Sequence, residues 1–446
     1  MIIKKTILLF FVFITGLSTI YTQQSFSLTQ ALDFAYSNNL DLKNSQLEEE
    51  RMVAQKNEIR GIGLPQVSAS FDIKDYVELP TSLLPAEIFG GQPDTFLPIK
   101  FGTQYNADAG ISASQIIFNG DYIVALQSSK VFIDLTKKAT FQTKLEVAEK
   151  VSKAYYLVLV NDERAKLLNN NIVQLQKVLD DAQIMYETGY VEQVDVDRLK
   201  VSLNNLKSED DKLKKLVVLS RSMLKFQMGM AISELIVLSD KLENLDLNSL
   251  TLNSDSTVDY TKRNEYSMLE SQRTVNELKL KRNKYAYLPS VVAYGNLTTQ
   301  AQRTEFDIFD TSKPWFAMGL IGAKLTVPIF SGTQRKYQTQ QSKIELLQTE
   351  NKLKQLEQGI DLQVSSAQVN LENSSATLTN EKDNMDLAQR VYDTVVKKYN
   401  EGVGSNLEVV TAETALKNAT TNYHTALYDA IIAKIDLDKA LGILIK

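Results

Sequence analysis

Residues 101–118, FGTQYNADAGISASQIIF, alternate between apolar and polar side chains and lead into a long stretch without helix breakers. Alternation with a period of two is typical of a β-strand with one apolar and one polar face. The apolar face carries Phe101, Tyr105, Ala107, Ala109, Ile111, Ala113 and Ile117, and the polar face carries Gln104, Asn106, Asp108, Ser112 and Ser114. The next 66 residues, 121–186, contain neither Pro nor Gly. They predict a single helix roughly 100 Å long, at about 1.5 Å per residue.

The eight prolines mark where the chain is not helical, because proline in a helix interior costs about 3 kcal/mol. They fall in two windows, 65–98 and 289–328. We predict strands at about 66–79 and 101–118 in the first window, and at about 290–300 and 315–330 in the second, with loops at 80–100 and 300–314. In the last strand Trp315 begins an apolar face, and Lys324 lies on the opposite, polar face.

The two halves of the chain match each other. Tyr186-Glu187-Thr188-Gly189, followed by Val194-Asp195, corresponds to Tyr399-Asn400-Glu401-Gly402, followed by Leu407-Glu408, at a constant offset of 213 residues. Self-similarity of this kind predicts a tandem duplication. We expect a first repeat at 24–229 with short helices, the first strands, a long helix at about 121–186 and a helix at about 192–228. A connecting segment covers 230–257. The second repeat, 258–446, has a helix, the second strands, a long helix at about 333–399 and a helix at about 405–445.

Composition excludes several classes of function. The chain of 446 residues has no Cys, a single His and a formal net charge of −5. Disulfide scaffolds, cysteine zinc sites and thiol nucleophiles are therefore excluded, and no basic run suits a nucleic-acid partner. We expect no enzyme activity, no cofactor and no metal site, and we expect His424 to be a packed or solvated residue.

The N-terminal segment and the strands bear on where the chain resides. Residues 1–23, in which Lys4 and Lys5 precede a short apolar stretch, have the layout of a secretory signal peptide. No later segment offers 18 consecutive apolar residues, so any membrane insertion after export must use strands. Four strands cannot close a barrel, since the smallest outer-membrane barrels use about eight. Either a dimer or a trimer would supply enough strands, and a half-buried sheet in a soluble protein is the alternative.

Aromatic residues near the ends of the strands would then lie at the membrane surfaces, as a girdle. We expect four of them at the inner surface and Trp315 near the outer one, with packing in a protein core as the alternative. The four are Phe118, Tyr285, Tyr287 and Phe330.

With Tyr186 and Gly189, and Tyr399 and Gly402, at the turns that close the long helices, the duplicated pattern resembles the TolC-like outer-membrane efflux protein family over essentially the whole mature chain. The resemblance implies a mainly α fold with a small β part. Duplicated long-helix hairpins would form a periplasmic α-barrel, and four antiparallel strands per chain would contribute to a 12-stranded trimeric outer-membrane β-barrel. It also implies a homotrimer in outer-membrane lipid, a periplasmic membrane-fusion adaptor and an inner-membrane pump of the resistance-nodulation-division, ABC or a similar class.

The resemblance further suggests which residues carry the function. The family closes its tunnel with two acidic residues three positions apart on the second long helix. Asp393 matches the first position and Val396 occupies the second, so a double acidic ring is not preserved. A solvated helix residue is the alternative for Asp393. The adaptor would dock at the helix tips, on Tyr186, Gly189, Val194, Asp195, Tyr399, Gly402, Gly404, Leu407 and Glu408, and a plain helix cap is the alternative there. Gly189, Gly402 and Gly404 are expected to supply positive backbone dihedrals at these turns.

We therefore expect an outer-membrane exit duct of a tripartite efflux or type I secretion system in a Gram-negative bacterium. Its helices would extend into the periplasm, and Gln104, Asn106, Asp108, Ser112, Ser114 and Lys324 would line the lumen of the barrel. The alternative function is a periplasmic coiled-coil scaffold or adaptor whose sheet stays in water.

Overall fold

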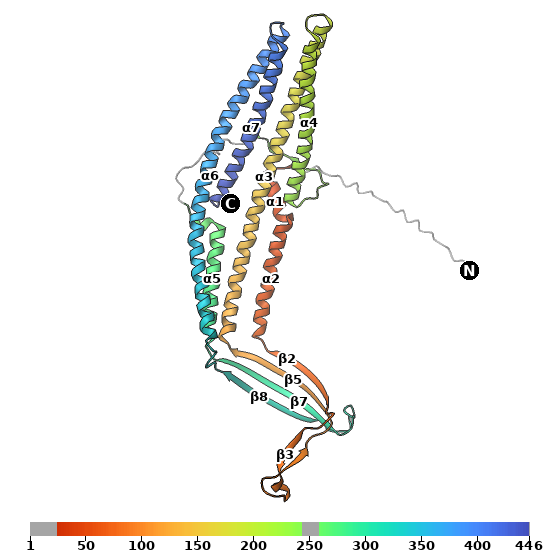
Figure 1. Cartoon of the computed structure of the whole chain (residues 1–446), viewed down its shortest axis with the longest axis vertical. Coiled ribbons are helices and arrows are strands. Elements are labelled where there is room, and N and C mark those ends of the chain that lie inside the picture. The colour runs from red at the N-terminus through yellow and green to blue at the C-terminus, as the bar shows by residue number, and fades with distance from the viewer. Residues whose placement is uncertain (1–24, 243–257, 446) are drawn as a thin grey trace, which may run out of the picture. The chain divides into compact units, whose positions relative to one another are not determined.

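The computed structural model describes residues 25–242 and 258–445 (Figure 1). Helices make up 67% of the described residues and strands 16%, which confirms the prediction of a mainly α fold with a small β part. The signal peptide predicted for 1–23 and residues 243–257 of the predicted connecting segment lie outside the described residues. Among the described residues, no helix has the length and apolar character needed to cross a lipid bilayer.

The chain divides into two compact units. Among the described residues, the first comprises 25–40, 146–242 and 367–438, and the second comprises 41–145, 258–366 and 439–445. Two long helices, α3 (Gly120–Glu187) and α6 (Gln334–Asn400), contribute residues to both units.

The second unit contains a four-stranded antiparallel sheet. Its strands, in spatial order, are β2 (Gln66–Asp75), β5 (Tyr105–Phe118), β7 (Ser290–Arg303) and β8 (Phe316–Thr326). The segment around each proline-rich window thus supplies two strands of this sheet, and the two pairs join through β5 and β7. Strands β2 and β8 are the edges of the sheet, and neither has a partner on its outer side among the described strands.

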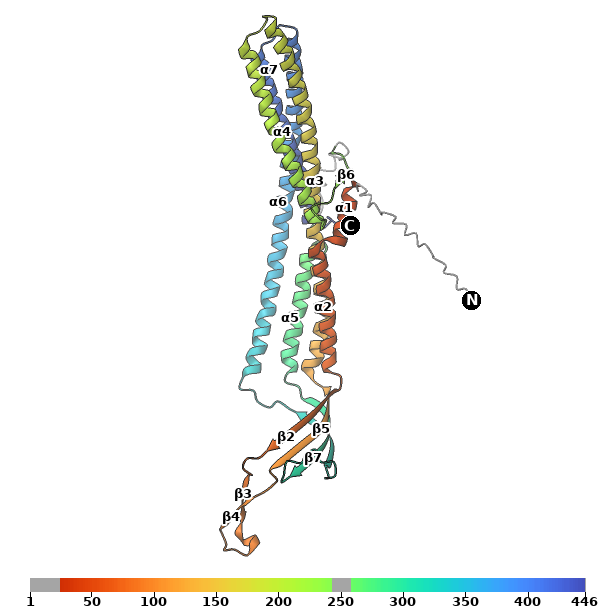
Figure 2. The ribbon, with the colours of Figure 1, turned by 90° about the vertical axis from the view of Figure 1, so that its right-hand side faces the viewer.

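Four helical segments reach this sheet at the same end (Figures 1 and 2). Helix α2 (Leu40–Ile62) precedes β2, α3 follows β5, α5 (Asn264–Tyr285) precedes β7, and α6 follows β8. Polar side chains join neighbouring helices at short distances. Lys138 Nζ of α3 donates to Ser271 Oγ of α5 at 2.7 Å, and Asn276 Nδ2 of α5 donates to Thr349 Oγ1 of α6 at 2.8 Å.

Several strand ends differ from the predictions. Strand β2 ends at Asp75, four residues before the predicted end at 79, and β8 ends at Thr326, ahead of Pro328. Strand β5 begins at Tyr105 and not at 101, because Gly102 adopts a positive φ of 104° that ends the extended chain. Strand β7 extends three residues beyond its predicted end, to Arg303.

The segment predicted as a loop at 80–100 is in fact structured. It contains β3 (Thr81–Pro85), the 3-10 helix η1 (Ala86–Phe89) and β4 (Phe96–Lys100), and β3 pairs with β4 in a separate two-stranded sheet. The hairpin could not be predicted from the residue pattern, because Pro85 and Pro98 lie within its strands and proline is usually counted against a strand.

The described residues of the first unit form apolar cores, two of which lie at different places along the helices. The unit contains α1 (Leu28–Asn38), α4 (Gln193–Met228), α7 (Asn406–Ala440) and a parallel pair of short strands, β1 (Ser25–Phe26) and β6 (Val237–Leu238). One core lies near the helix tips, and its members include Leu175, Leu199, Tyr399 and Val409. In the other, the buried Tyr155 hydroxyl lies 2.9 Å from both the Phe26 carbonyl and Asp240 Oδ2. These two hydrogen bonds of the Tyr155 hydroxyl connect the region of the short strands to α3.

Candidate functional site

The main sheet has two different faces, as the alternation predicted. On β5, Asn106, Asp108, Ser112 and Ser114 point to one face, and the register places Lys324 of β8 on the same face. Polar contacts run across this face between strands: Ser68 Oγ lies 2.7 Å from Ser112 Oγ, and Lys74 Nζ lies 3.2 Å from Asp108 Oδ2.

Two features of the polar face were not foreseen. Gln104 lies before the start of β5, where its side-chain amide Nε2 donates to Asp75 Oδ1 at 3.1 Å. Gln104 therefore lies at the end of the sheet that is remote from the helices, and it is not part of β5. On β8, Phe316, Met318 and Leu320 alternate onto the polar face and are exposed. Because residues 316–323 of β8 are apolar on both faces, simple alternation gave no reason to assign them there.

The opposite face of the sheet is apolar and exposed to solvent in the single chain. Val67, Ile111, Leu297 and Ile321 lie on it, and Ile321 is 94% exposed. No described helix packs across this face, because the helices continue beyond one end of the strands (Figures 1 and 2). An exposed apolar sheet face of this kind marks an interaction surface for lipid or protein.

Aromatic side chains gather at the helix end of the sheet. Phe118 ends β5, Tyr285 ends α5, Tyr287 follows it, and Phe330, which is 86% exposed, lies between β8 and α6. Strict alternation would place Phe118 on the polar face. A β-bulge between Ile116 and Phe118 instead sets Phe118 opposite Val291, on the apolar face. The bulge could not be read from the sequence pattern.

A second group lies at the other end of the sheet, around the loop between β7 and β8. Ile308 is 1% exposed and packs on Ala107 and Ala301, with Tyr105 and Trp315 beside them. Trp315 is therefore partly covered by its own chain. Phe306 stacks edge to face with Tyr105 at 5.4 Å between ring centroids and is otherwise exposed. Phe306 and Ile308 could not be assigned a role from the sequence, because the segment between β7 and β8 has no periodic pattern and is expected to be a loop.

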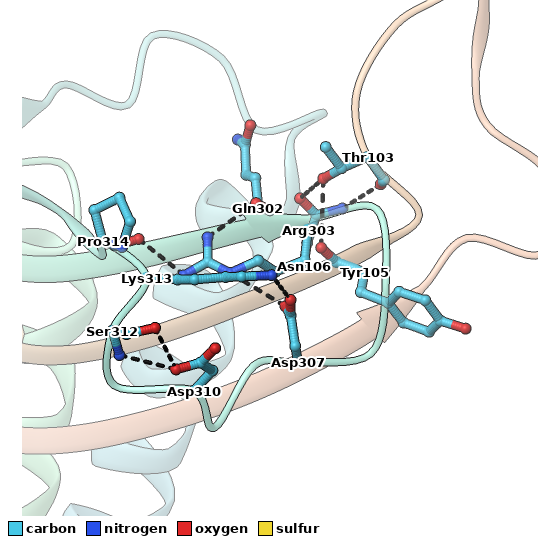
Figure 3. A network of polar contacts seen from close by, with 10 residues as sticks. All are labelled: Thr103, Tyr105, Asn106, Gln302, Arg303, Asp307, Asp310, Ser312, Lys313 and Pro314. Atoms are coloured by element: carbon cyan, nitrogen blue, oxygen red, sulfur yellow. Dashed lines mark hydrogen bonds and ion pairs between the residues drawn. The ribbon is translucent and has the colours of Figure 1, made fainter.

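Charged side chains fix the shape of this loop, as Figure 3 shows. The buried Arg303 guanidinium donates to the carbonyls of Gln302 and Pro314, each at 3.0 Å, and its Nε lies 3.4 Å from Asp307 Oδ1. Lys313 also pairs with Asp307, and this contact raises the pKa of Lys313. The loop therefore has a defined structure.

The helix tips are closed by glycines, in two different ways. Gly189 and Gly402 adopt positive φ values of 82° and 79°, as predicted, and an added Cβ would meet open space at either position. The same prediction for Gly404 is wrong, since Gly404 does not have a positive φ. A Cβ there would lie 2.8 Å from the backbone nitrogen of Tyr399, so glycine is required by close packing.

Around these turns the predicted docking residues are partly buried and partly exposed. Tyr399 belongs to the tip core, whereas Tyr186, Val194 and Leu407 are exposed. Asp195 lies near its own helix N-terminus, 3.9 Å from Arg198, and Glu408 is exposed in the first turn of α7.

The two predicted constriction residues lie in different environments. Asp393 is exposed on α6 and accepts a hydrogen bond from Gln389 Nε2 at 2.9 Å. Val396 is half-buried and packs against the tip core. This turn of α6 thus presents the Asp393 carboxylate to solvent. Val396, at the second predicted position, packs the helix against its neighbours.

A groove of about 470 Å³ lies between α4 and α7 near the tips, and its lining includes Val194, Arg198, Val410 and Lys417. Its wall contains Glu413, whose Oε2 accepts a hydrogen bond from Ser202 Oγ at 2.8 Å. Burial raises the pKa of the Glu413 carboxyl above its usual range.

Comparisons with known proteins agree with this geometry. The model of a family described as outer membrane efflux protein matches residues 31–214 and 279–443. The comparison with curated proteins gives no match.

Similar folds occur in solved structures. CusC, whose structures concern folding and transmembrane channel formation, is 15% identical, with 95% of each chain covered and a TM-score of 0.74. The outer membrane protein VceC of Vibrio cholerae is 13% identical over 93% of this chain and 96% of its own, with a TM-score of 0.69. The open-state outer membrane channel MtrE of Neisseria gonorrhoeae is 16% identical over 93% of this chain and 88% of its own, with a TM-score of 0.70.

The family model spans most of the chain, and the similar solved structures share its arrangement of long helices and a small sheet. The resemblance found in the sequence is confirmed, and the family consists of channel proteins and not enzymes. This chain therefore belongs to the outer membrane efflux protein family, as an outer-membrane exit duct whose helices extend into the periplasm.

Proposed function

We propose that three copies of the chain assemble into the duct and that their sheets close into one 12-stranded barrel. The observation that carries this proposal is the main sheet, which has an exposed apolar face and two open edges, β2 and β8. Unpaired strand edges within hydrocarbon would leave backbone groups without hydrogen bonds. Pairing β8 of one copy with β2 of the next satisfies both edges and turns the apolar face toward lipid.

The polar face then lines a water-filled lumen. The members proposed for it are Gln104, Asn106, Asp108, Ser112, Ser114 and Lys324, with Gln104 at the outer rim. Phe118, Tyr285, Tyr287 and Phe330 lie at the inner membrane surface, and Trp315 lies near the outer surface. The alternative, a periplasmic scaffold with its sheet in water, would expose the apolar face to solvent and is therefore disfavoured.

The helix tips are proposed to dock a periplasmic membrane-fusion adaptor. Exposed apolar side chains, among them Val194, Val403 and Leu407, surround the turns, and the groove between α4 and α7 opens beside them. Through the adaptor the duct joins an inner-membrane pump of the resistance-nodulation-division, ABC or a similar class, which supplies the energy for efflux or for type I secretion. The duct itself catalyses no reaction and carries no cofactor.

Asp393 is proposed to line the constriction of the closed tunnel. Because each copy contributes one carboxylate at this position, a trimer would hold a ring of three. Val396 holds the same turn of α6 against the tip core and does not add a second ring.

The test of the duct is its assembly and conductance. The purified chain should have the mass of three copies in detergent and should conduct ions in planar lipid bilayers. A stable monomer that inserts without conductance would reject the proposal.

Docking is tested separately with a photoreactive residue placed at Val403, at the tip, or at Val173, an exposed control position on α3. The tip position should cross-link a membrane-fusion adaptor encoded by the same host, and the control should not. Equal labelling from both positions would contradict docking at the tip.

A further inference from the structure

The hairpin formed by residues 81–100 has a defined structure of its own. Strands β3 and β4 pair from Thr81 opposite Lys100 to Pro85 opposite Phe96. At the tip of the hairpin the Ala86 amide donates to the Thr95 carbonyl at 2.8 Å, and at its base Lys100 lies 3.4 Å from Glu78. None of its strands joins the main sheet.

This hairpin exposes large apolar side chains. Phe89 and Phe96 are 59% and 60% exposed, and Leu83, Ile88 and Leu97 are exposed as well. An isolated two-stranded hairpin is at best marginally stable in water. A contiguous exposed apolar patch on a folded protein usually marks an interaction surface. We therefore expect a partner to cover the exposed apolar side chains of the hairpin.

The position of the hairpin in the chain identifies that partner. Only residues 76–80 separate it from β2, which is an open edge of the main sheet. The hairpin continues past the end of the strands that is remote from the helices (Figure 2), so in a membrane-spanning barrel it stands outside the hydrocarbon. Where β2 meets β8 of another copy, the base of the hairpin lies at the junction between two copies.

We propose that residues 81–100 form a clasp between copies of this chain, in which the apolar side chains around Phe89 and Phe96 pack against the extracellular segments of an adjacent copy. This inference rests on the proposed function, because only the closed barrel brings β2 of one copy beside β8 of another. The clasp adds an extracellular contact between copies to the strand pairing within the membrane.

The test uses a photoreactive benzoylphenylalanine in place of Phe89 or Phe96 in the full chain, expressed in the outer membrane of a host cell. Leu297, on the apolar face of the central strand β7, serves as the control, since it is expected to face lipid. Irradiation at Phe89 or Phe96 should give an adduct of two copies of this chain, and irradiation at Leu297 should not. An adduct with lipid or with another protein, or no adduct, would overturn the clasp.

Electrophoresis of the unheated, non-irradiated protein separates this inference from the proposed function. If an oligomer is present but Phe89 and Phe96 give no adduct between copies, the clasp is rejected and the duct is retained. If no oligomer forms, the duct proposal itself fails.

A second measurement follows the dissociation temperature of the oligomer. The double variant Phe89→Ser and Phe96→Ser should dissociate at a lower temperature than the unmodified chain. Val173→Ser, which changes an exposed apolar residue on α3 and outside the hairpin, is the control and should leave this temperature unchanged. An unchanged temperature in the double variant would contradict the clasp.

Discussion

The buried imidazole of His424 gives the sharpest physical prediction about this protein. His424 lies in α7, is 2% exposed, and neither ring nitrogen has a hydrogen-bond partner among the described residues. Burial, with a smaller contribution from the positive charge of Arg164, lowers the pKa of His424 to about 4. The ring is therefore neutral in the folded chain at neutral pH.

The sign and size of the pH effect follow from this pKa. The pKa of His424 is about 4 in the folded chain and near 6.5 when the chain is unfolded, so the unfolded state binds a proton first as the pH falls. The stability that the neutral His424 ring contributes is fully present above the pKa of the unfolded chain. This stability is lost progressively as the pH falls toward the pKa of the folded chain. At about 1.36 kcal/mol per pH unit the total loss is on the order of 3 kcal/mol per chain.

The perturbation is His424→Leu, which removes the titrating group and also two unpaired buried nitrogens. At neutral pH the variant should be at least as stable as the unmodified chain, because no hydrogen bond is lost. Between about pH 6.5 and 4 the unmodified chain should lose stability relative to the variant. Denaturant midpoints followed by helix circular dichroism in detergent, at a series of pH values, measure this difference.

The pKa itself can be read directly, because the chain contains one histidine. In protein prepared without a histidine tag, a single labelled imidazole resonance should titrate near pH 4. A titration near 6.5 would refute the reasoning, since it would mean that water or an anionic partner reaches the ring in the assembled protein. Parallel stability curves for His424→Leu and the unmodified chain would refute it independently.

Four further substitutions test other parts of the structure. Gly402→Ala should destabilise the helix tip by about 1 kcal/mol, because of the positive φ of Gly402, whereas Gly359→Ala, within α6, should stabilise the helix by a similar amount. Glu413→Gln should stabilise the chain at neutral pH, because burial raises the carboxyl pKa and ionisation then costs stability as the pH rises through that pKa. Ile308→Ala should destabilise the packing of the loop between β7 and β8 on the sheet by about 2–4 kcal/mol. Proteases should then cleave this loop faster.

Each of these predictions has its own check. The unfolding temperature should fall in Gly402→Ala and rise in Gly359→Ala. Equal shifts in the two variants would contradict the role given to the positive φ of Gly402. For Glu413→Gln, a stability difference from the unmodified chain that does not grow with pH would be inconsistent with a raised pKa. For Ile308→Ala, unchanged cleavage in the loop by an external protease would show that Ile308 does not hold the loop on the sheet.

Much of the fold could be predicted from local patterns. The absence of Pro and Gly over residues 121–186 determined a long helix because helix propensity and amphipathic spacing act over neighbouring residues. The alternation in residues 105–113 likewise determined the two faces of β5, since side chains of an extended strand alternate whatever lies around them. The glycines at 189 and 402 marked left-handed turns because few other residues adopt a positive φ at low cost.

Other features depend on which segments meet, and these could not be predicted. The order of strands in the sheet, the bulge that returns Phe118 to the apolar face, and the packing of Ile308 on β5 and β7 all involve residues far apart in the chain. Gly404 shows the distinction most clearly. The sequence determined that a glycine lies in the tip, but only the tertiary structure decided that it is required by the nearby backbone of Tyr399 and not by a positive φ. A dihedral preference belongs to one residue, whereas a steric limit arises from whatever the fold places beside it.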